Sequence, residues 1–270
     1  AHFGVCGGCK WQHMNYEKQL FYKNKEVQDH LQRIGGITAE EVFPILGAPD
    51  QFYYRNKMEY SFSNQKWLTR AQIKSDEVVD NRNALGFHIP GYWDKILDLK
   101  ECHLQEPLGN EIREFIKDKA QDLALDFFDP RAQTGHLRTL MLRNTTLGQW
   151  MVLIQFYEDP GPLKDQLLQS IVEAFPAVTS LLYVINQKAN DTLYDQDIHL
   201  FHGTDYIVEA MGDLRFHINA KSFYQTNSKQ AIGLYDIVKD FAGLTGGQGV
   251  YDLYTGTGTI AQYIAGQAKW

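Results

Sequence analysis

Two groups of residues in this 270-residue chain could do chemistry, and they lie in different parts of it. Residues 250–260 run from an apolar stretch into a turn with Gly256 and Gly258, and residues 261–265 can open a helix. Glycine lets the backbone approach a ligand where a Cβ atom would collide, and the start of a helix offers free N–H groups. This β-turn-α pattern predicts a binding site for a nucleotide-like ligand.

The glycine turn does not fit the two common phosphate-binding fingerprints. A dinucleotide fingerprint needs a third glycine where Ala261 stands, and a P-loop needs a lysine after its last glycine. The acidic Asp252, the aromatic Tyr254 and the two glycines resemble instead the loop with which methyltransferases bind S-adenosylmethionine (SAM). A tight turn without a ligand is the alternative.

Three cysteines form the second group. Cys6 and Cys9 have the C-x-x-C spacing, and Cys102 is distant in sequence. In an intracellular protein this spacing indicates metal or redox chemistry. A four-iron cluster takes four thiolates, so a zinc site with three cysteines and one histidine, a Cys6–Cys9 disulfide and unliganded thiols are alternatives. The histidine of such a zinc site would be one of His2, His13 and His103.

Residues 220–227 and 252–259 together resemble the RNA uracil-5-methyltransferase family, whose members carry S-F-F-Q-x-N followed by D-L-Y-C-G-x-G-x. Residues 2–9 and 101–104 are similar to the iron–sulfur cysteines of the family branch that methylates 23S ribosomal RNA. The motifs occur in the family's order, and the resemblance covers nearly the whole chain.

The resemblance implies SAM-dependent methylation of uracil C5 in RNA, with ribosomal RNA preferred. It implies that Phe223 packs against the target base or its neighbour. It assigns the SAM contacts to Gln225, Asp252, Tyr254, Gly256, Gly258 and Thr259. It further implies a 4Fe-4S cluster held by Cys6, Cys9 and Cys102, with a fourth cysteine immediately before Ala1. The family commonly has Cys at 255 and Asn at 259, so Thr255 and Thr259 depart from its pattern.

The family's chemistry needs a cysteine thiolate that adds to C6 of uracil and a base that removes the C5 proton after methyl transfer. The resemblance places both groups after Trp270. We therefore assign no catalytic residue and expect this chain alone to be inactive. We also expect its C-terminal domain to be truncated, because one strand with its helices cannot cover both faces of a parallel sheet.

A formal net charge of −7 argues against a broad nucleic-acid-binding surface, so contacts with RNA must be local. Cations are interleaved with aromatic residues in several stretches, a mixture that suits single-stranded RNA. A half-buried sheet with solvated cations on its outer face would have the same composition. The candidates are Arg55, Lys57, Arg70, Arg138 and Arg143, with Tyr53, Tyr54, Phe62 and Trp67.

The elements that position these residues read as an α+β fold followed by a Rossmann-like one. Apolar spacing predicts helices over residues 16–34, 109–123, 160–175 and 228–241. Alternation predicts strands over residues 53–63, 84–88 and 96–99. Residues 137–143 and 150–156 read as paired strands, and residues 178–186 and 205–219 as further strands. We predict a central α+β domain over residues 1–221 and the start of an α/β Rossmann-like methyltransferase domain over residues 222–270.

Other function classes fit parts of the chain. A non-catalytic RNA-binding or assembly module would keep a structural metal site, an electron-transfer protein would bind no SAM, and a transfer RNA uracil-5-methyltransferase would share the SAM motifs. No apolar run approaches the roughly 18 residues of a membrane span, and the first residues do not read as a signal peptide. We expect a cytoplasmic protein that does not enter a membrane.

Overall fold

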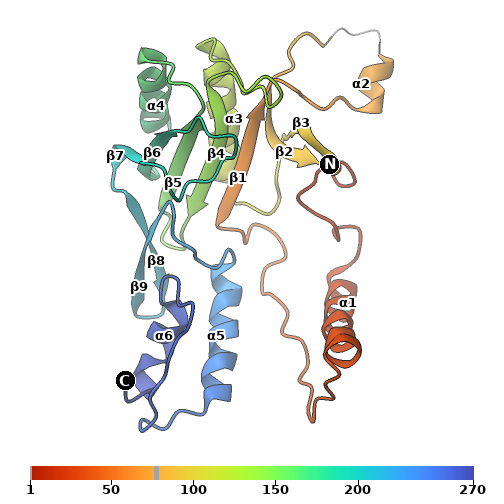
Figure 1. The fold of residues 1–270 in the computed structure, drawn as a ribbon, viewed down its shortest axis with the longest axis vertical. Helices are drawn as coiled ribbons and strands as arrows, with labels where there is room; N and C mark the ends of the chain where they lie inside the picture. Colours follow the sequence, from red (N-terminus) through yellow and green to blue (C-terminus); the bar gives the residue numbers. More distant parts are fainter. Residues whose placement is uncertain (1, 76–78) are drawn as a thin grey trace.

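The protein is organised around one mixed β-sheet, seen here in a computed structural model that describes residues 2–75 and 79–270. The sheet has seven strands in the order β3-β2-β1-β4-β5-β6-β7 (Figure 1). The strands are β1 (Lys57–Ser63), β2 (Ala84–Ile89), β3 (Tyr92–Asp98), β4 (Leu137–Asn144), β5 (Trp150–Phe156), β6 (Val178–Ile185) and β7 (His199–Gly203). β5 and β6 pair in parallel, and the other neighbours pair antiparallel.

Each face of the sheet carries a different layer. Helices α3 (Pro107–Asp122) and α4 (Pro162–Ala174) pack on one face through Ile112, Ile116 and Leu167. The hairpin of β8 (Tyr206–Met211) and β9 (Leu214–Asn219) packs with helix α5 (Ser228–Ala242) on the other face, over Met151 and Leu153. Because both faces are covered there, all residues of β5 are buried.

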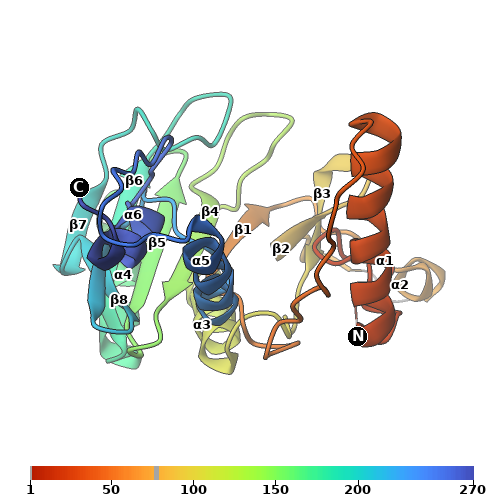
Figure 2. The same ribbon diagram turned by 90° about the horizontal axis from the view of Figure 1, so that it is seen from below.

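Helix α1 (Tyr16–Asp29) lies to one side of the molecule, apart from α5 and α6 (Thr259–Ile264), as Figures 1 and 2 show. Its N-cap is Asn15, whose Oδ1 accepts a hydrogen bond from Lys18 N. A π-helical turn, His30–Ile34, ends it before Gly35. Within the described part of the chain, no helix combines the length and the apolar character needed to cross a membrane.

Most predicted elements are confirmed, and the differences have physical causes. Residues 205–219 form two strands, because Gly212 adopts φ 56° and turns the chain back on itself. The edge strand β7 was missed, since its mostly exposed residues give no clear alternation. The short helix α2 (Arg70–Lys74) was also missed. Residues 53–56 precede β1 as irregular backbone, with Tyr53 at φ 57°.

The strand that the β-turn-α pattern predicts at the start of residues 250–260 is wrong, because residues 250–253 are irregular. These residues form no ladder with any strand in the described ranges, and the backbone N–H of Val250 donates to Trp270 O at 3.0 Å instead. A strand is stable only when a neighbour satisfies its backbone groups. The glycine turn and the helix after it, α6, do form. The domain boundary expected at Lys221 falls in the connection between β9 and α5 and stays a prediction.

Candidate functional site

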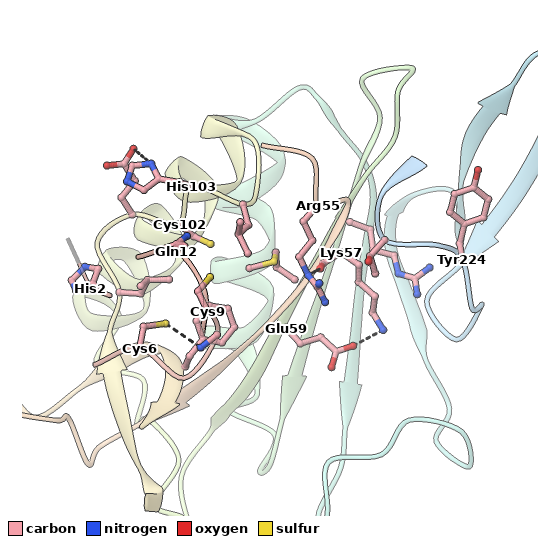
Figure 3. Close-up of a pocket in the computed structure, with 18 of the residues that line it drawn as sticks. His2, Cys6, Cys9, Gln12, Arg55, Lys57, Glu59, Cys102, His103 and Tyr224 are labelled. Atoms are coloured by element: carbon pink, nitrogen blue, oxygen red, sulfur yellow. Dashed lines mark hydrogen bonds and ion pairs between the residues drawn. The ribbon is translucent and has the colours of Figure 1, made fainter. Parts of the chain in front are cut away.

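The three cysteines meet at one cavity of about 480 Å³ near the start of β1. Cys6 and Cys9 come from the N-terminal loop, and Cys102 comes from the loop between β3 and α3. Figure 3 shows their side chains on one side of the cavity and Tyr224 on the other, with Arg55 and Lys57 between them. The structure therefore brings the predicted metal ligands together.

The N-terminal loop is held in a tight conformation around Cys6. The backbone N–H groups of Val5 and Cys6 both donate to His2 O, at 3.1 and 2.9 Å. Gly8 N donates to Cys6 Sγ at 3.4 Å. A Cβ atom on Gly7 would lie 2.4 Å from His88 O, so only glycine allows the loop to approach β2 this closely.

Cys102 is buried and is positioned by helix α3. Its backbone N–H donates to Asn110 Oδ1 at 2.8 Å, and Asn110 Nδ2 donates back to Cys102 O at 3.1 Å. Arg113 Nη1 also donates to Asn110 Oδ1, at 3.0 Å, and fixes this amide. These backbone hydrogen bonds to α3 fix the position of Cys102 in the wall of the cavity.

Burial raises the pKa of both the Cys6 and the Cys9 thiol, and the neighbouring Cys102 adds to both shifts. His2 and His103 line the same cavity, whereas His13 does not line it and lies against Phe3. Among residues 2–75 and 79–270, no group of three or more His, Cys, Asp or Glu side chains is arranged to hold a metal ion. The thiols are gathered, but they do not form a complete metal site.

Phe223, the predicted contact for the target base, also lines this cavity. The backbone on both sides of Lys221 is tied to Arg143, whose Nη1 and Nη2 donate to Asn219 O at 3.3 Å and Ser222 O at 2.6 Å. Burial lowers the pKa of Arg143 to about 10, so the side chain stays positively charged near neutral pH. Phe223 itself is exposed on this braced segment.

The glycine turn lies directly beside Phe223. Thr257 Oγ1 donates to Phe223 O at 3.0 Å, and a Cβ atom on Gly256 would lie 3.9 Å from Phe223 Cδ1. Gly256 and Gly258 adopt φ 57° and 73°, conformations that favour glycine. The predicted cofactor loop and the predicted base contact, which are separated by α5, are therefore neighbours.

The other predicted cofactor residues take different positions. Asp252 Oδ2 accepts from Thr255 Oγ1 at 3.0 Å and from Ala261 N at 3.2 Å, so it orders the turn and the start of α6. Thr259 is buried, and its hydroxyl shares a hydrogen bond with Tyr235 Oη at 2.9 Å. Tyr254 is fully exposed. Their roles toward SAM remain predictions.

A polar relay of Asn56, Ser228 and Glu209, which no sequence pattern predicted, holds the segment of Gln225. Asn56 Nδ2 donates to Gln225 O and to Ser228 Oγ, both at 2.9 Å, and Ser228 Oγ donates to Glu209 Oε2 at 2.7 Å. Glu209 is fully buried, and its Oε1 accepts from both the N–H and the hydroxyl of Thr146. The alternation of β8 carries the available signal, because it places Glu209 on the inward face with Ile207 and Met211.

The predicted RNA-facing cations divide into two kinds. Arg55 and Lys57 line the cavity. Arg138 is buried, donates to the backbone carbonyls of Asn186, Lys188 and Ala189, and lies over the Phe128 ring. The prediction is wrong for Arg138 and for Phe62, because both side chains are buried and Phe62 packs against Phe127 in the core.

No protein-family model matches this sequence. The chain is 53% identical to an uncharacterized RNA methyltransferase of Porphyromonas gingivalis and 50% identical to one of Bacteroides thetaiotaomicron. Both matches cover 99% of this chain, and they cover 59% and 60% of those relatives. A relative of the same description in Chlorobaculum tepidum is 40% identical, with 56% of its length covered. The chain thus spans well under two thirds of the relatives it matches.

One solved structure shares the fold described above. It is the crystal structure of the Pyrococcus abyssi tRNA (uracil-54, C5)-methyltransferase in complex with S-adenosyl-L-homocysteine. The match has a TM-score of 0.72 and 28% sequence identity, and it covers 96% of this chain and 56% of that one. The mixed sheet with its helices therefore matches the fold of a SAM-dependent methyltransferase.

Proposed function

Because relatives described as RNA methyltransferases and a matching uracil-C5 methyltransferase structure support this family, we propose that the chain is part of a SAM-dependent RNA uracil-5-methyltransferase. One observation carries the proposal. Phe223 stands between the cavity, which is open to a nucleotide, and the glycine turn, which suits an adenosyl group. A base stacked on Phe223 would lie next to the turn, as methyl transfer requires.

When bound, SAM supplies the methyl group, and the side chains of this protein bind and orient the two reactants. Gly256 and Gly258 allow the backbone of the turn to approach SAM closely. Gln225 offers its side-chain amide, and Asn56 fixes the backbone of this residue. Phe223 offers the aromatic surface on which a base extruded from its stack can lie. The three cysteines match the metal-ligand motif of the resemblance, so none of them is proposed as the nucleophile that adds to C6.

The substrate of this proposal is RNA with an unpaired uridine. Arg55 and Lys57 line the cavity and can contact phosphates. Ribosomal RNA is the first choice, because the C-x-x-C motif resembles the ribosomal branch. The structural match favours transfer RNA as a second candidate, since that relative is a tRNA methyltransferase.

Methyl transfer from labelled SAM tests the proposal directly. The full-length protein is incubated with unmodified 23S ribosomal RNA and with unmodified transfer RNA, and the nucleosides are analysed after digestion. We expect label in 5-methyluridine from ribosomal RNA. Label only from transfer RNA would select the second candidate, and the absence of 5-methyluridine from both substrates would reject the function.

We further propose that Cys6, Cys9 and Cys102 hold an iron–sulfur cluster in the whole protein. Thiolates are the ligands such clusters require, and the fold already gathers three of them. When bound, the cluster supplies covalent links between the N-terminal loop and the loop before α3. The alternative is zinc with His2 or His103, which line the same cavity.

Replacing Cys102 with serine is expected to remove most of the bound iron, because a hydroxyl is a poor ligand for this metal in place of a thiolate. Iron, sulfide and zinc are measured after anaerobic reconstitution of the full-length protein, together with the charge-transfer absorbance of the cluster. His13→Ala is the matched control, since His13 does not line the cavity. Zinc without iron in the unmodified protein, or full iron content in the serine variant, would contradict this assignment.

Replacing Gln225 with alanine is expected to weaken SAM binding by roughly 1–3 kcal/mol, as for the loss of one buried polar partner. Isothermal calorimetry on the full-length protein measures the change. Gln230→Ala is a suitable control, because Gln230 is also half-buried but donates to Leu46 O on the far side of α5. Equal SAM affinity in the Gln225 variant and the unmodified protein would refute the assignment.

A further inference from the structure

A second cavity of about 410 Å³ lies over the middle of the sheet, beside the one that contains Phe223. Its floor is formed by β1, β4 and β5, and its rim by residues 191–194 and 220–221. The two cavities share four lining residues, so they are adjacent. The shared residues are Lys57, Glu59, Tyr194 and Lys221. We call this second cavity the sheet pocket.

Gln155 on β5 lines the sheet pocket and is only 1% exposed. Neither its Nε2 nor its Oε1 has a hydrogen-bond partner among the described residues. A buried amide without partners is unfavourable, because it has given up its bonds to water. Its neighbours on this face are Thr139, its cross-strand partner on β4, and the apolar Met141 and Leu153, and none of these bonds to the amide among the described residues. Because Gln155 lines the pocket, a polar group that enters the pocket can supply partners for this amide.

The rim supplies the other contacts that a nucleotide needs. Tyr194 is 82% exposed and offers a ring on which a base can stack. Lys221 Nζ donates to Tyr194 O at 3.2 Å and to Gln196 O at 2.7 Å, so it fixes the loop that carries this ring. Lys57 Nζ, paired with Glu59 Oε1 at 2.5 Å, lies on the wall shared with the first cavity and can approach a connecting phosphate.

We propose that the sheet pocket binds an adenine of single-stranded RNA adjacent to the uridine on Phe223, and that Gln155 reads its edge. A glutamine amide can donate to adenine N7 and accept from the adenine N6 amino group at the same time. Both unpartnered atoms of Gln155 are then satisfied. This inference rests on the proposed function and adds a position at which the RNA sequence is recognised.

The test measures binding of short fluorescent RNA strands to the full-length protein by anisotropy. Each strand carries one uridine in a cytidine background, with adenosine, guanosine or cytidine at one flanking position. The unmodified protein should prefer adenosine at one of these positions by roughly tenfold, the discrimination typical of one bidentate contact. Gln155→Met should reduce the preference for adenosine to less than about twofold. Binding of the strand with cytidine at the flanking position should not weaken.

A melting temperature and two further variants show whether the loss of the adenosine preference comes from the contact itself or from a folding defect. The melting temperature of Gln155→Met should equal or exceed that of the unmodified protein, because the substitution removes an unpaired buried amide. Tyr194→Ala, which changes only an exposed rim residue, should also lower the preference. Gln166→Leu on α4, at the opposite face of the sheet, is the matched control and should keep it.

An adenosine preference that persists in Gln155→Met would overturn the inference. Binding and methylation of RNA without any flanking-base preference would overturn it as well, and would leave the proposed function intact. If the unmodified protein neither binds these strands nor methylates RNA, the proposed function is wrong and this inference is rejected with it.

Discussion

Replacing Glu209 with alanine is expected to lower the free energy of unfolding by about 3–5 kcal/mol, one of the largest effects available to a single substitution in this fold. The carboxylate accepts four hydrogen bonds, from Thr146 N, Thr146 Oγ1, Ala210 N and Ser228 Oγ. Alanine would leave these donors without an acceptor in a region closed to water. Urea-induced unfolding of the full-length protein, followed by circular dichroism, measures the loss.

The same substitution should also disturb the cofactor side of the site. Ser228 Oγ, which donates to Glu209, accepts from the same Asn56 amide that holds Gln225 O. We therefore expect weaker SAM binding in Glu209→Ala even at temperatures where the variant is folded. Glu173→Ala on α4 is the control, since this exposed glutamate accepts only from Gln169 among the described residues, and its effect should stay within about 0.5 kcal/mol. Equal stability of the two variants would disprove the structural role of Glu209.

Replacing Phe223 with alanine is expected to lower kcat/KM for methylation by roughly 5- to 150-fold, which corresponds to the loss of one base–aromatic stack. Phe223 is 67% exposed, so its removal costs little core packing. Its backbone O accepts from Thr257 Oγ1 and does not depend on the ring, so the glycine turn should keep its place. The loss should therefore fall on RNA and leave the affinity for SAM nearly unchanged.

Phe241→Ala provides a matched control for this experiment. Phe241 is 70% exposed, on α5, and packs against Phe43 rather than lining the cavity. Its replacement should leave kcat/KM within about twofold of the unmodified protein. Equal effects of the two substitutions would mean that Phe223 acts only as a surface aromatic residue, and the proposed site would have to be moved.

The cavity connects two features that the sequence presents separately. The cysteines and Phe223 line the same cavity, and Figure 3 shows Arg55 and Lys57 between the cysteines and Tyr224, the neighbour of Phe223 in the chain. In the proposed function, a cluster bound there would order the wall of the cavity to which we assign RNA binding. For this reason, loss of the cluster is expected to affect RNA binding more than SAM binding.

The sequence by itself determined the elements and the local motifs. The hairpin of β4 and β5, helices α3 to α5 and the glycine turn all follow from apolar spacing and turn residues that act over a few neighbours. The motif around Phe223 was recognisable from its resemblance to the RNA uracil-5-methyltransferase family, and the C-x-x-C pair from its spacing. The strand expected at residues 250–253 failed, because a strand depends on a neighbour that no local pattern can supply.

Only the tertiary structure decided which side chains meet. Arg55, Arg138 and Arg143 look alike in the sequence, yet Arg138 binds loop carbonyls in the interior while Arg55 lines the cavity. Glu209 gave no sequence signal beyond its place in an alternating strand, and Gln155 none beyond its place in an otherwise apolar strand. Whether a buried polar group has partners depends on chain segments far away in sequence, since hydrogen bonds form between atoms that are close in space. That is why the relay of Glu209 and the unpartnered amide of Gln155 appear only in the folded protein.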